Sequence, residues 1–140
     1  MQSIALPVEM GLENKVVQLY VGNTPILVCA PAKEGERENF HRDILWGVLN
    51  ELRLPFMTID FSEDKTFKLG PNKQSNSYQV VGMGYCKMEQ GKYKFYGISK
   101  NYNIGINEEH LRSISGICSL ILEKVDNHFI LYSNQLTFLS

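Results

Sequence analysis

Residues 15–30 read KVVQLYVGNTPILVCA, and this stretch decides the fold class of the chain. Residues 15–21 and 25–30 are two runs rich in β-branched and other apolar residues, which is the composition of strands. Gly22 and Asn23 stand between the runs, and both favour tight turns because they tolerate positive φ angles. The stretch therefore predicts a β-hairpin.

A helix is predicted after this hairpin, beyond the charged residues 33–38. Six apolar residues recur there at helical spacing and form one stripe: Phe40, Ile44, Leu45, Val48, Leu49 and Leu52. Acidic residues at positions 34, 36 and 38 suit the positive end of the helix dipole. Pro55 ends the helix, and residues 56–61 (FMTIDF) are expected to form a strand.

The second half of the chain repeats this alternation of strands and a helix. Residues 78–88 and 92–98 are predicted strands, and Asn107 is a good N-cap for a second helix. The apolar stripe of that helix is expected to include Leu111, Ile114, Cys118, Ile121 and Val125. Residues 4–8 and 128–132 complete the set as a first and a last strand. The order predicts an α+β fold, a mixed β-sheet flanked by two α-helices.

The length of 140 residues fits one domain. Residues 62–77 (SEDKTFKLGPNKQSNS) are polar with Gly-Pro in the middle, which predicts a long surface loop. Neither flank of this segment shows an obvious core of its own. We therefore interpret residues 62–77 as an insertion within a single domain that spans residues 1–140.

Composition argues against several classes of function. The net charge of -1 lacks the basic character of proteins that bind nucleic-acid polymers, and no apolar run approaches the roughly 20 residues of a membrane helix. The N-terminus has no basic segment typical of a signal peptide. The three cysteines are widely separated, which argues against a disulfide framework or a zinc site. A cytoplasmic protein without a metal or other cofactor is expected.

His41 lies in the first turn of the first predicted helix, within FHRDIL. Exposed amides at a helix N-terminus are partly positive, which favours a neutral imidazole over the cation. A neutral imidazole can accept a proton, so His41 is a candidate general base. The alternative is a surface or half-buried histidine that caps its own helix.

Residues 96–107 (YGISKNYNIGIN) connect a predicted strand to the second helix. Their glycine and asparagine residues allow several backbone amides to turn toward one point beside a helix N-terminus, where anions bind favourably. Ser99 could add a hydroxyl donor and Lys100 a positive charge. An ordinary surface loop has the same composition. Residues 82–84 (GMG) indicate close backbone packing in a strand rather than a dinucleotide fingerprint.

Four segments together resemble the protein phosphohistidine phosphatase family, also called the Janus/Ocnus family. They read ALPVEM, NKVVQLYV, FHRDIL and GKYKFYGISKNY, and the likeness extends over about residues 3–135. The resemblance implies a phosphohistidine-phosphatase-like fold with His41 as the catalytic histidine and Lys15 as the family's lysine. It also implies that Ser99 and the amide of Asn101 belong to a phosphate-binding loop.

The chain departs from the family pattern at two places. The family's glycine-rich strand ends in an arginine that helps to hold phosphate, whereas the matching stretch VVGMGYC has Met83 or Tyr85 near that position. Lys87 could replace the charge of this arginine but not the fork geometry of a guanidinium. The family's loop continues tyrosine-glycine-proline, whereas this chain continues with residues 102–104 (YNI). The expected phosphate-binding residues are Lys15, Lys87, Ser99, Lys100, Asn101 and Tyr102.

Two functions fit these features. The first is a metal-independent phosphohydrolase acting on a phosphorylated protein, with His41 as general base or nucleophile and a phosphate-binding loop around Ser99. The second is a non-catalytic protein that sequesters a phosphorylated small molecule or nucleotide at the same site, which the missing arginine and the longer loop favour. A third reading is an interaction domain that only retains the motifs.

Overall fold

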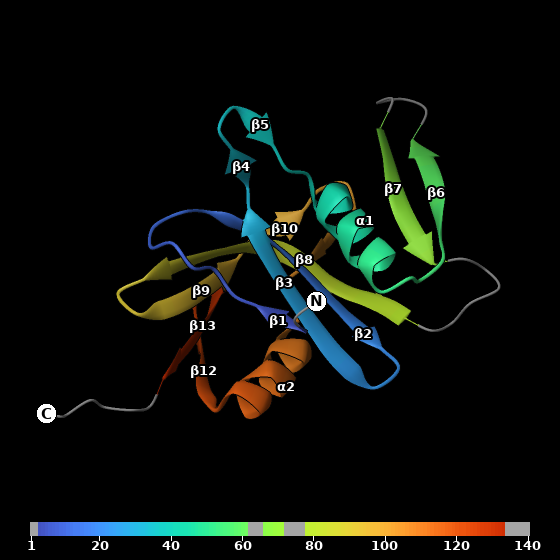
Figure 1. The fold of residues 1–140 in the computed structure, drawn as a ribbon. Coiled ribbons are helices and arrows are strands. Elements are labelled where there is room, and N and C mark those ends of the chain that lie inside the picture. The colour runs from blue at the N-terminus through green and yellow to red at the C-terminus, as the bar shows by residue number, and fades with distance from the viewer. Residues whose placement is uncertain (1–2, 62–65, 72–77, 134–140) are drawn as a thin grey trace, which may run out of the picture.

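The computed structural model describes residues 3–61, 66–71 and 78–133, and its centre is a curled mixed sheet of seven strands (Figure 1). In spatial order these strands are β1 (Ile4–Ala5), β3 (Thr24–Pro31), β2 (Asn14–Val21), β8 (Tyr78–Glu89), β9 (Lys92–Tyr96), β13 (His128–Ser133) and β12 (Leu120–Val125). β1 runs parallel to β3, and the other neighbouring strands are antiparallel.

Smaller elements surround this sheet in the described part of the chain. The helices are α1 (His41–Glu51) and α2 (Glu108–Cys118). Three antiparallel hairpins accompany them: β4 (Lys33–Glu34) with β5 (Arg37–Glu38), β6 (Phe56–Phe61) with β7 (Thr66–Pro71), and β10 (Ile98–Ser99) with β11 (Ile104–Gly105). The predicted α+β class with two helices is confirmed.

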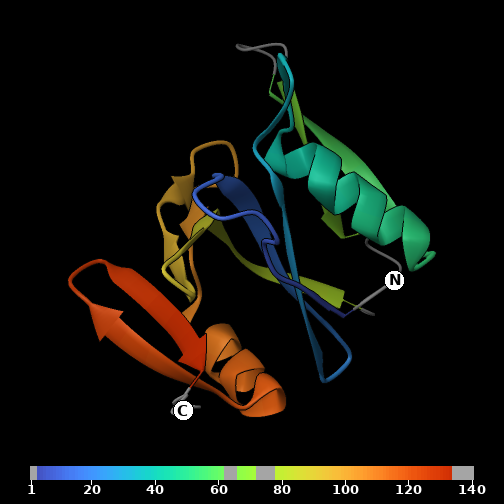
Figure 2. The same cartoon turned by 60° about the vertical axis from the view of Figure 1, so that its left-hand side comes forward.

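The sheet separates two hydrophobic cores, because alternate residues of its central strand β2 face opposite sides. Val17 and Leu19 of β2 pack with apolar residues of α1 in one buried cluster. Val16 packs with apolar residues of α2 in the other. Figure 2 shows the two helices on opposite sides of β2 and β3. The helix that carries His41 is therefore held against one face only.

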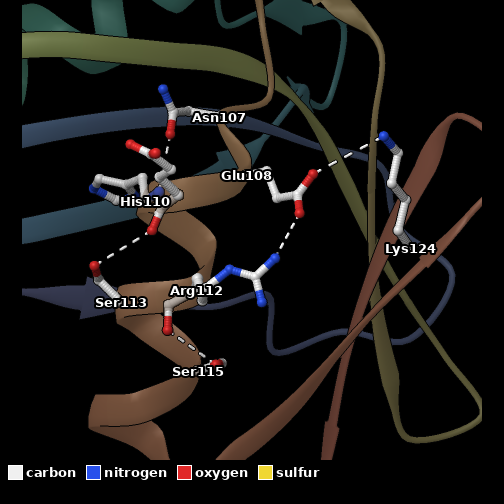
Figure 3. Close-up of polar contacts among 8 residues, drawn as sticks. Asn107, Glu108, His110, Arg112, Ser113, Ser115 and Lys124 are labelled. Atoms are coloured by element: carbon white, nitrogen blue, oxygen red, sulfur yellow. Dashed lines mark hydrogen bonds and ion pairs between the residues drawn. The ribbon is translucent and has the colours of Figure 1, made fainter.

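The hairpin predicted from residues 15–30 is present as β2 and β3, with Gly22 at a φ of 61° in the turn. Both helix starts are also confirmed. α1 begins at His41 behind an extended Phe40. Asn107 is the N-cap of α2, where its side-chain oxygen accepts a hydrogen bond from the backbone nitrogen of His110 at 2.9 Å (Figure 3).

The predicted loop at residues 62–77 is wrong in part, because Thr66–Pro71 forms β7 and pairs with β6. A partner strand supplies backbone hydrogen bonds that composition does not reveal. The polar residues and the Gly-Pro pair of this segment favour a loop, so its pairing with β6 was not predicted. Residues 62–65 and 72–77 lie outside the described residues.

The predicted stripe of α2 is wrong beyond Cys118, where the chain forms the additional strand β12. The predicted last strand at residues 128–132 is present as β13. Ser119 ends the helix in a left-handed conformation with a φ of 55°. Ile121 and Val125 lie in β12, which pairs with β13. Their spacing from Cys118 also fits a helix, but the strand pairing satisfies their backbone groups and prevails.

Other boundaries shift by a few residues. Residues 33–38 form the hairpin of β4 and β5, so Asp43 is the acidic residue in the first turn of α1. The first strand ends at Ala5, before the predicted residue 8. The strand predicted to reach residue 98 ends at Tyr96, because Gly97 has a φ of 77° and turns the chain into β10.

A buried polar network anchors α2 to the sheet. The Gln18 side chain of β2 accepts a hydrogen bond from the backbone nitrogen of Asn107 at 2.7 Å and donates one to its carbonyl oxygen at 3.0 Å. His110 Nε2 donates to the carbonyl oxygen of Leu19 at 3.0 Å, so Nδ1 accepts from Gln18 at 3.2 Å. Burial lowers the pKa of His110, and the ring is held neutral.

Ion pairs on the surface add little to this anchor. Glu108 lies 2.6 Å from Arg112 Nη2 and 3.9 Å from Lys124 Nζ, linking the start of α2 to β12 (Figure 3). Pairs of this kind between solvent-exposed side chains contribute about 1 kcal/mol or less. The position of α2 therefore depends on the buried network and on the apolar packing of Leu111 and Ile114.

β8 approaches other segments closely at Gly84. A Cβ atom at this position would lie 2.8 Å from the carbonyl oxygen of Tyr96 and 2.6 Å from Cδ1 of Ile106. Real Cβ atoms essentially never come within 3.0 Å of another heavy atom, so a side chain here forces the backbone apart. The reading of residues 82–84 as close backbone packing is confirmed.

We expect Gly84→Ala to lower the free energy of unfolding by about 1–3 kcal/mol, because the added methyl overpacks this crossing. Gly47→Ala is the matched control. Gly47 lies in α1 with open space around it, and alanine is the better helix former, so this change should raise stability by up to about 1 kcal/mol. Chemical denaturation of both variants gives the comparison, and equal effects would contradict the close approach.

Candidate functional site

A cavity of about 340 Å³ lies where α1 begins, and six of the predicted site residues line it: Lys15, His41, Ser99, Lys100, Asn101 and Tyr102. They come from β2, from α1, and from the β10–β11 hairpin with its connecting turn. The structure does not bring Lys87 to this cavity. Lys87 lies further along β8, opposite Lys94 of β9.

His41 is buried at the floor of the cavity. Its Nε2 lies 2.8 Å from the carbonyl oxygen of Gly84. Because a carbonyl oxygen only accepts hydrogen bonds, Nε2 carries the hydrogen of the neutral ring and Nδ1 holds the lone pair. The ring is bonded to β8, so His41 does not cap its own helix, which was the alternative reading.

The imidazole of His41 is held in its neutral form. Burial lowers the pKa of His41, and the nearby ammonium of Lys15 lowers it further, while the hydrogen bond to Gly84 acts in the opposite direction. The ring of Tyr85 packs edge-on against the imidazole, with 5.5 Å between ring centroids. His41 can therefore accept a proton at neutral pH.

Lys15 is buried although it carries a charge. It lies on β2, between β3 and β8, so its position is central in the sheet and not at an edge. Its Nζ lies 3.3 Å from an oxygen of Glu38 and 5.1 Å from the ring centroid of Phe40. The carboxylate and the aromatic face together stabilise the buried ammonium.

Ser99 ends β10 and is also buried. Its Oγ accepts a hydrogen bond from the backbone nitrogen of Tyr102 at 3.4 Å, and a hydroxyl can donate its hydrogen at the same time. Residues 99–104 form a tight turn, because Ser99 pairs with Ile104 and Asn103 adopts a φ of 54°. This turn brings Lys100 and Asn101 to the mouth of the cavity.

Sequence reasoning missed five residues that line the cavity: Glu38, Phe40, Arg42, Tyr85 and Ile98. Arg42 is the most important, because it brings a guanidinium to a site that was expected to lack one. It stands directly after His41 in FHRDIL, so a signal was present in the quoted motif. The family pattern places its arginine on the strand that corresponds to β8, not in this helix. Glu38 gave no such signal, because its place depends on the hairpin of β4 and β5.

Positive charges outnumber negative ones around the cavity. Three cationic side chains line it, those of Lys15, Arg42 and Lys100, and Glu38 is the carboxylate in the lining. Asp43 does not line the cavity, but its Oδ1 lies 3.8 Å from Nε of Arg42. The Cζ atom of Arg42 lies 5.0 Å from the ring centroid of Phe40, so two of the cations contact one aromatic side chain. The arrangement favours an anion with more than one negative charge.

The described residues include no group of three or more histidine, cysteine, aspartate or glutamate side chains placed to hold a metal ion. No helix in the described part of the chain has the length and apolar character needed to cross a membrane. No protein-family model, curated protein or solved structure matches the chain.

We expect inorganic phosphate to raise the pKa of His41, because a bound anion stabilises the imidazolium. Without phosphate, that pKa should lie below its ordinary value of about 6.5. Histidine-selective NMR titrations with and without phosphate measure both quantities. His110 is the internal control, because it lies in the network of α2 and does not line the cavity. Equal shifts at both histidines, or none at His41, would contradict an anion site here.

Proposed function

We propose that the chain is a metal-independent phosphohydrolase of the phosphohistidine-phosphatase kind, with a phosphohistidine-phosphatase-like fold. Its substrate would be a protein that carries a phosphoryl group on an imidazole nitrogen. The observation that carries this proposal is the neutral, buried imidazole of His41, with its lone pair on Nδ1, in a cavity lined by two buried or half-buried cations, Lys15 and Arg42.

The floor of the cavity has the groups that a phosphoryl group requires. A guanidinium can form two parallel hydrogen bonds to phosphoryl oxygens, and Arg42 would supply this fork. Lys15 would add a compact charge, and the Ser99 hydroxyl would donate one further hydrogen bond. These groups would stabilise the charge that develops on the phosphoryl oxygens during transfer.

In the simplest reaction His41 acts as a general base. The water oxygen bonds to phosphorus while a water proton passes to Nδ1. The P–N bond breaks, and its electron pair stays on the substrate nitrogen. A substrate imidazole protonated on its other nitrogen then leaves as a neutral ring. In the variant reaction Nδ1 itself bonds to phosphorus, and water hydrolyses the phosphorylated His41 in a second step.

A second candidate function is sequestration of a nucleotide or another phosphorylated small molecule. The observation that favours it lies at the mouth of the cavity, where the side chains of Phe40 and Ile98 are exposed. A nucleobase could stack on the ring of Phe40 while its phosphate occupies the floor. The same cavity would then hold its ligand without reaction.

We expect the protein to release phosphate from a phosphohistidine peptide over many turnovers, and His41→Ala to lower kcat by about 10²- to 10⁴-fold. Arg42→Lys should lower kcat/KM about tenfold, because it keeps the charge and loses the fork. Arg112→Lys is the control, since Arg112 pairs with Glu108 on the surface of α2. Phosphate release under steady-state conditions measures all three variants.

Two results would overturn the enzymatic proposal. One is the absence of turnover together with recovery of one equivalent of intact ligand per protein, which would support sequestration. The other is full turnover by His41→Ala. A phosphorylated protein trapped at high pH would separate the nucleophilic role of His41 from the general-base role, because only the former transfers the phosphoryl group to the enzyme.

A further inference from the structure

We propose that Glu38, beside the ring of Phe40, forms a cation subsite at the mouth of this cavity. It would select ligands in which a positively charged nitrogen lies close to the phosphoryl group. This inference rests on the proposed phosphoryl site and states which charge the rest of the ligand must carry. Its chemical class includes phosphoryl groups on protonated imidazole, amine or guanidine nitrogens, and phosphate esters of amino alcohols.

The depth of the side chains divides the cavity into a floor and a mouth. Lys15, His41 and Ser99 are 5%, 7% and 3% exposed, so the groups that would bind or attack a phosphoryl group are deep. The side chain of Glu38 is 51% exposed, and Phe40 is 39% exposed. A phosphoryl group bound at the floor therefore directs the remainder of its ligand toward Glu38 and Phe40.

The ion pair between Lys15 and Glu38 makes the charge of that remainder important. Glu38 lies 3.3 Å from the ammonium that would contact the phosphoryl oxygens, so a bound dianion and the carboxylate lie near one another. Two like charges at short range repel, and the repulsion is relieved when a cation stands between them. A ligand with its own positive nitrogen supplies this cation, whereas a phosphate ester of an uncharged alcohol does not.

The other charged residues that line the cavity are cations, so a ligand cation is attracted only to the side where Glu38 lies. Arg42 follows His41 in α1, and Lys100 stands on the turn between β10 and β11. Glu38 belongs to a different hairpin, formed by β4 and β5. Glu34 and Glu36 of the same hairpin are also exposed, but neither lines the cavity. The subsite therefore depends on one carboxylate.

A matched pair of stable ligands tests the subsite without any turnover. Phosphoethanolamine and n-propyl phosphate have similar size and the same phosphate group, but only the former carries an ammonium. We expect the protein to bind phosphoethanolamine about fivefold more tightly, the scale of a partly exposed ion pair. Glu38→Gln should remove this preference and should bind inorganic phosphate more tightly, since the carboxylate that repels it is gone.

Glu36→Gln is the matched control, because it removes the same charge two residues away from Glu38 and outside the cavity lining. The preference should survive in this variant. NMR titration or calorimetry gives the dissociation constants. The proposal is overturned if the protein does not prefer phosphoethanolamine, or if Glu38→Gln keeps the preference. The proposal is also overturned if Glu38→Gln binds both ligands more tightly by the same factor. Glu38 would then only compete with the phosphate group for Lys15.

A second arm separates this inference from the proposed function. With phosphohistidine as substrate, Glu38 would favour the protonated, reactive ring, so Glu38→Gln should move the alkaline limb of the kcat profile to lower pH. A limb that does not move would overturn the assignment of the substrate ring to this subsite. If the protein prefers phosphoethanolamine but shows no turnover, the hydrolase proposal is contradicted and the cation subsite is supported.

Discussion

The hydrogen bond between the imidazole of His41 and the carbonyl oxygen of Gly84 is the contact on which the site depends. It joins the first residue of α1 to β8, and it leaves Nδ1 as the ring nitrogen that can take a proton. Only glycine fits at position 84, because Ile106 and the carbonyl oxygen of Tyr96 occupy the space that a side chain would need. The packing of β8 and the chemical state of the imidazole are therefore linked.

The two buried histidines, His41 and His110, have similar surroundings but differ in the partner of the second ring nitrogen. Burial lowers the pKa of both His41 and His110, and both donate a hydrogen bond to a backbone carbonyl. In His110 the second ring nitrogen accepts from Gln18, so the ring is committed to holding α2. Within the described residues, His41 uses only Nε2 in this way and lines a cavity. The unshared electron pair distinguishes a candidate base from a structural histidine.

The charges of the cavity follow from one buried lysine. Burying an ammonium in a central strand is costly unless a counter-charge is close, and Glu38 and the face of Phe40 meet this requirement for Lys15. The same ion pair places a carboxylate at the mouth of a cavity whose other charged lining residues are cationic. The residues that stabilise the buried Lys15 are thus the same ones on which the proposed ligand selectivity rests.

The sequence by itself determined the features that depend on neighbours along the chain. The turn at Gly22, the N-cap at Asn107 and the apolar stripe of α1 were predictable, because periodicity, capping and turn conformation are local properties. His41 and the segment around Ser99 were identified as candidates by their type and by a resemblance, but their meeting in one cavity could not be derived from spacing alone.

Only the tertiary structure decided which segments pair and which side chains meet in the cavity. Thr66–Pro71 became a strand because β6 lies beside it, and residues after Cys118 left the helix because β13 offers a ladder. Arg42 and Glu38 joined the site for the same reason, since the start of α1 and the hairpin before it are folded against Lys15. The two hairpins join neighbouring segments whose own patterns did not reveal the pairing, whereas the contact between Lys15 and Glu38 joins residues 23 positions apart. In both cases the pattern of one segment holds no information about its partner.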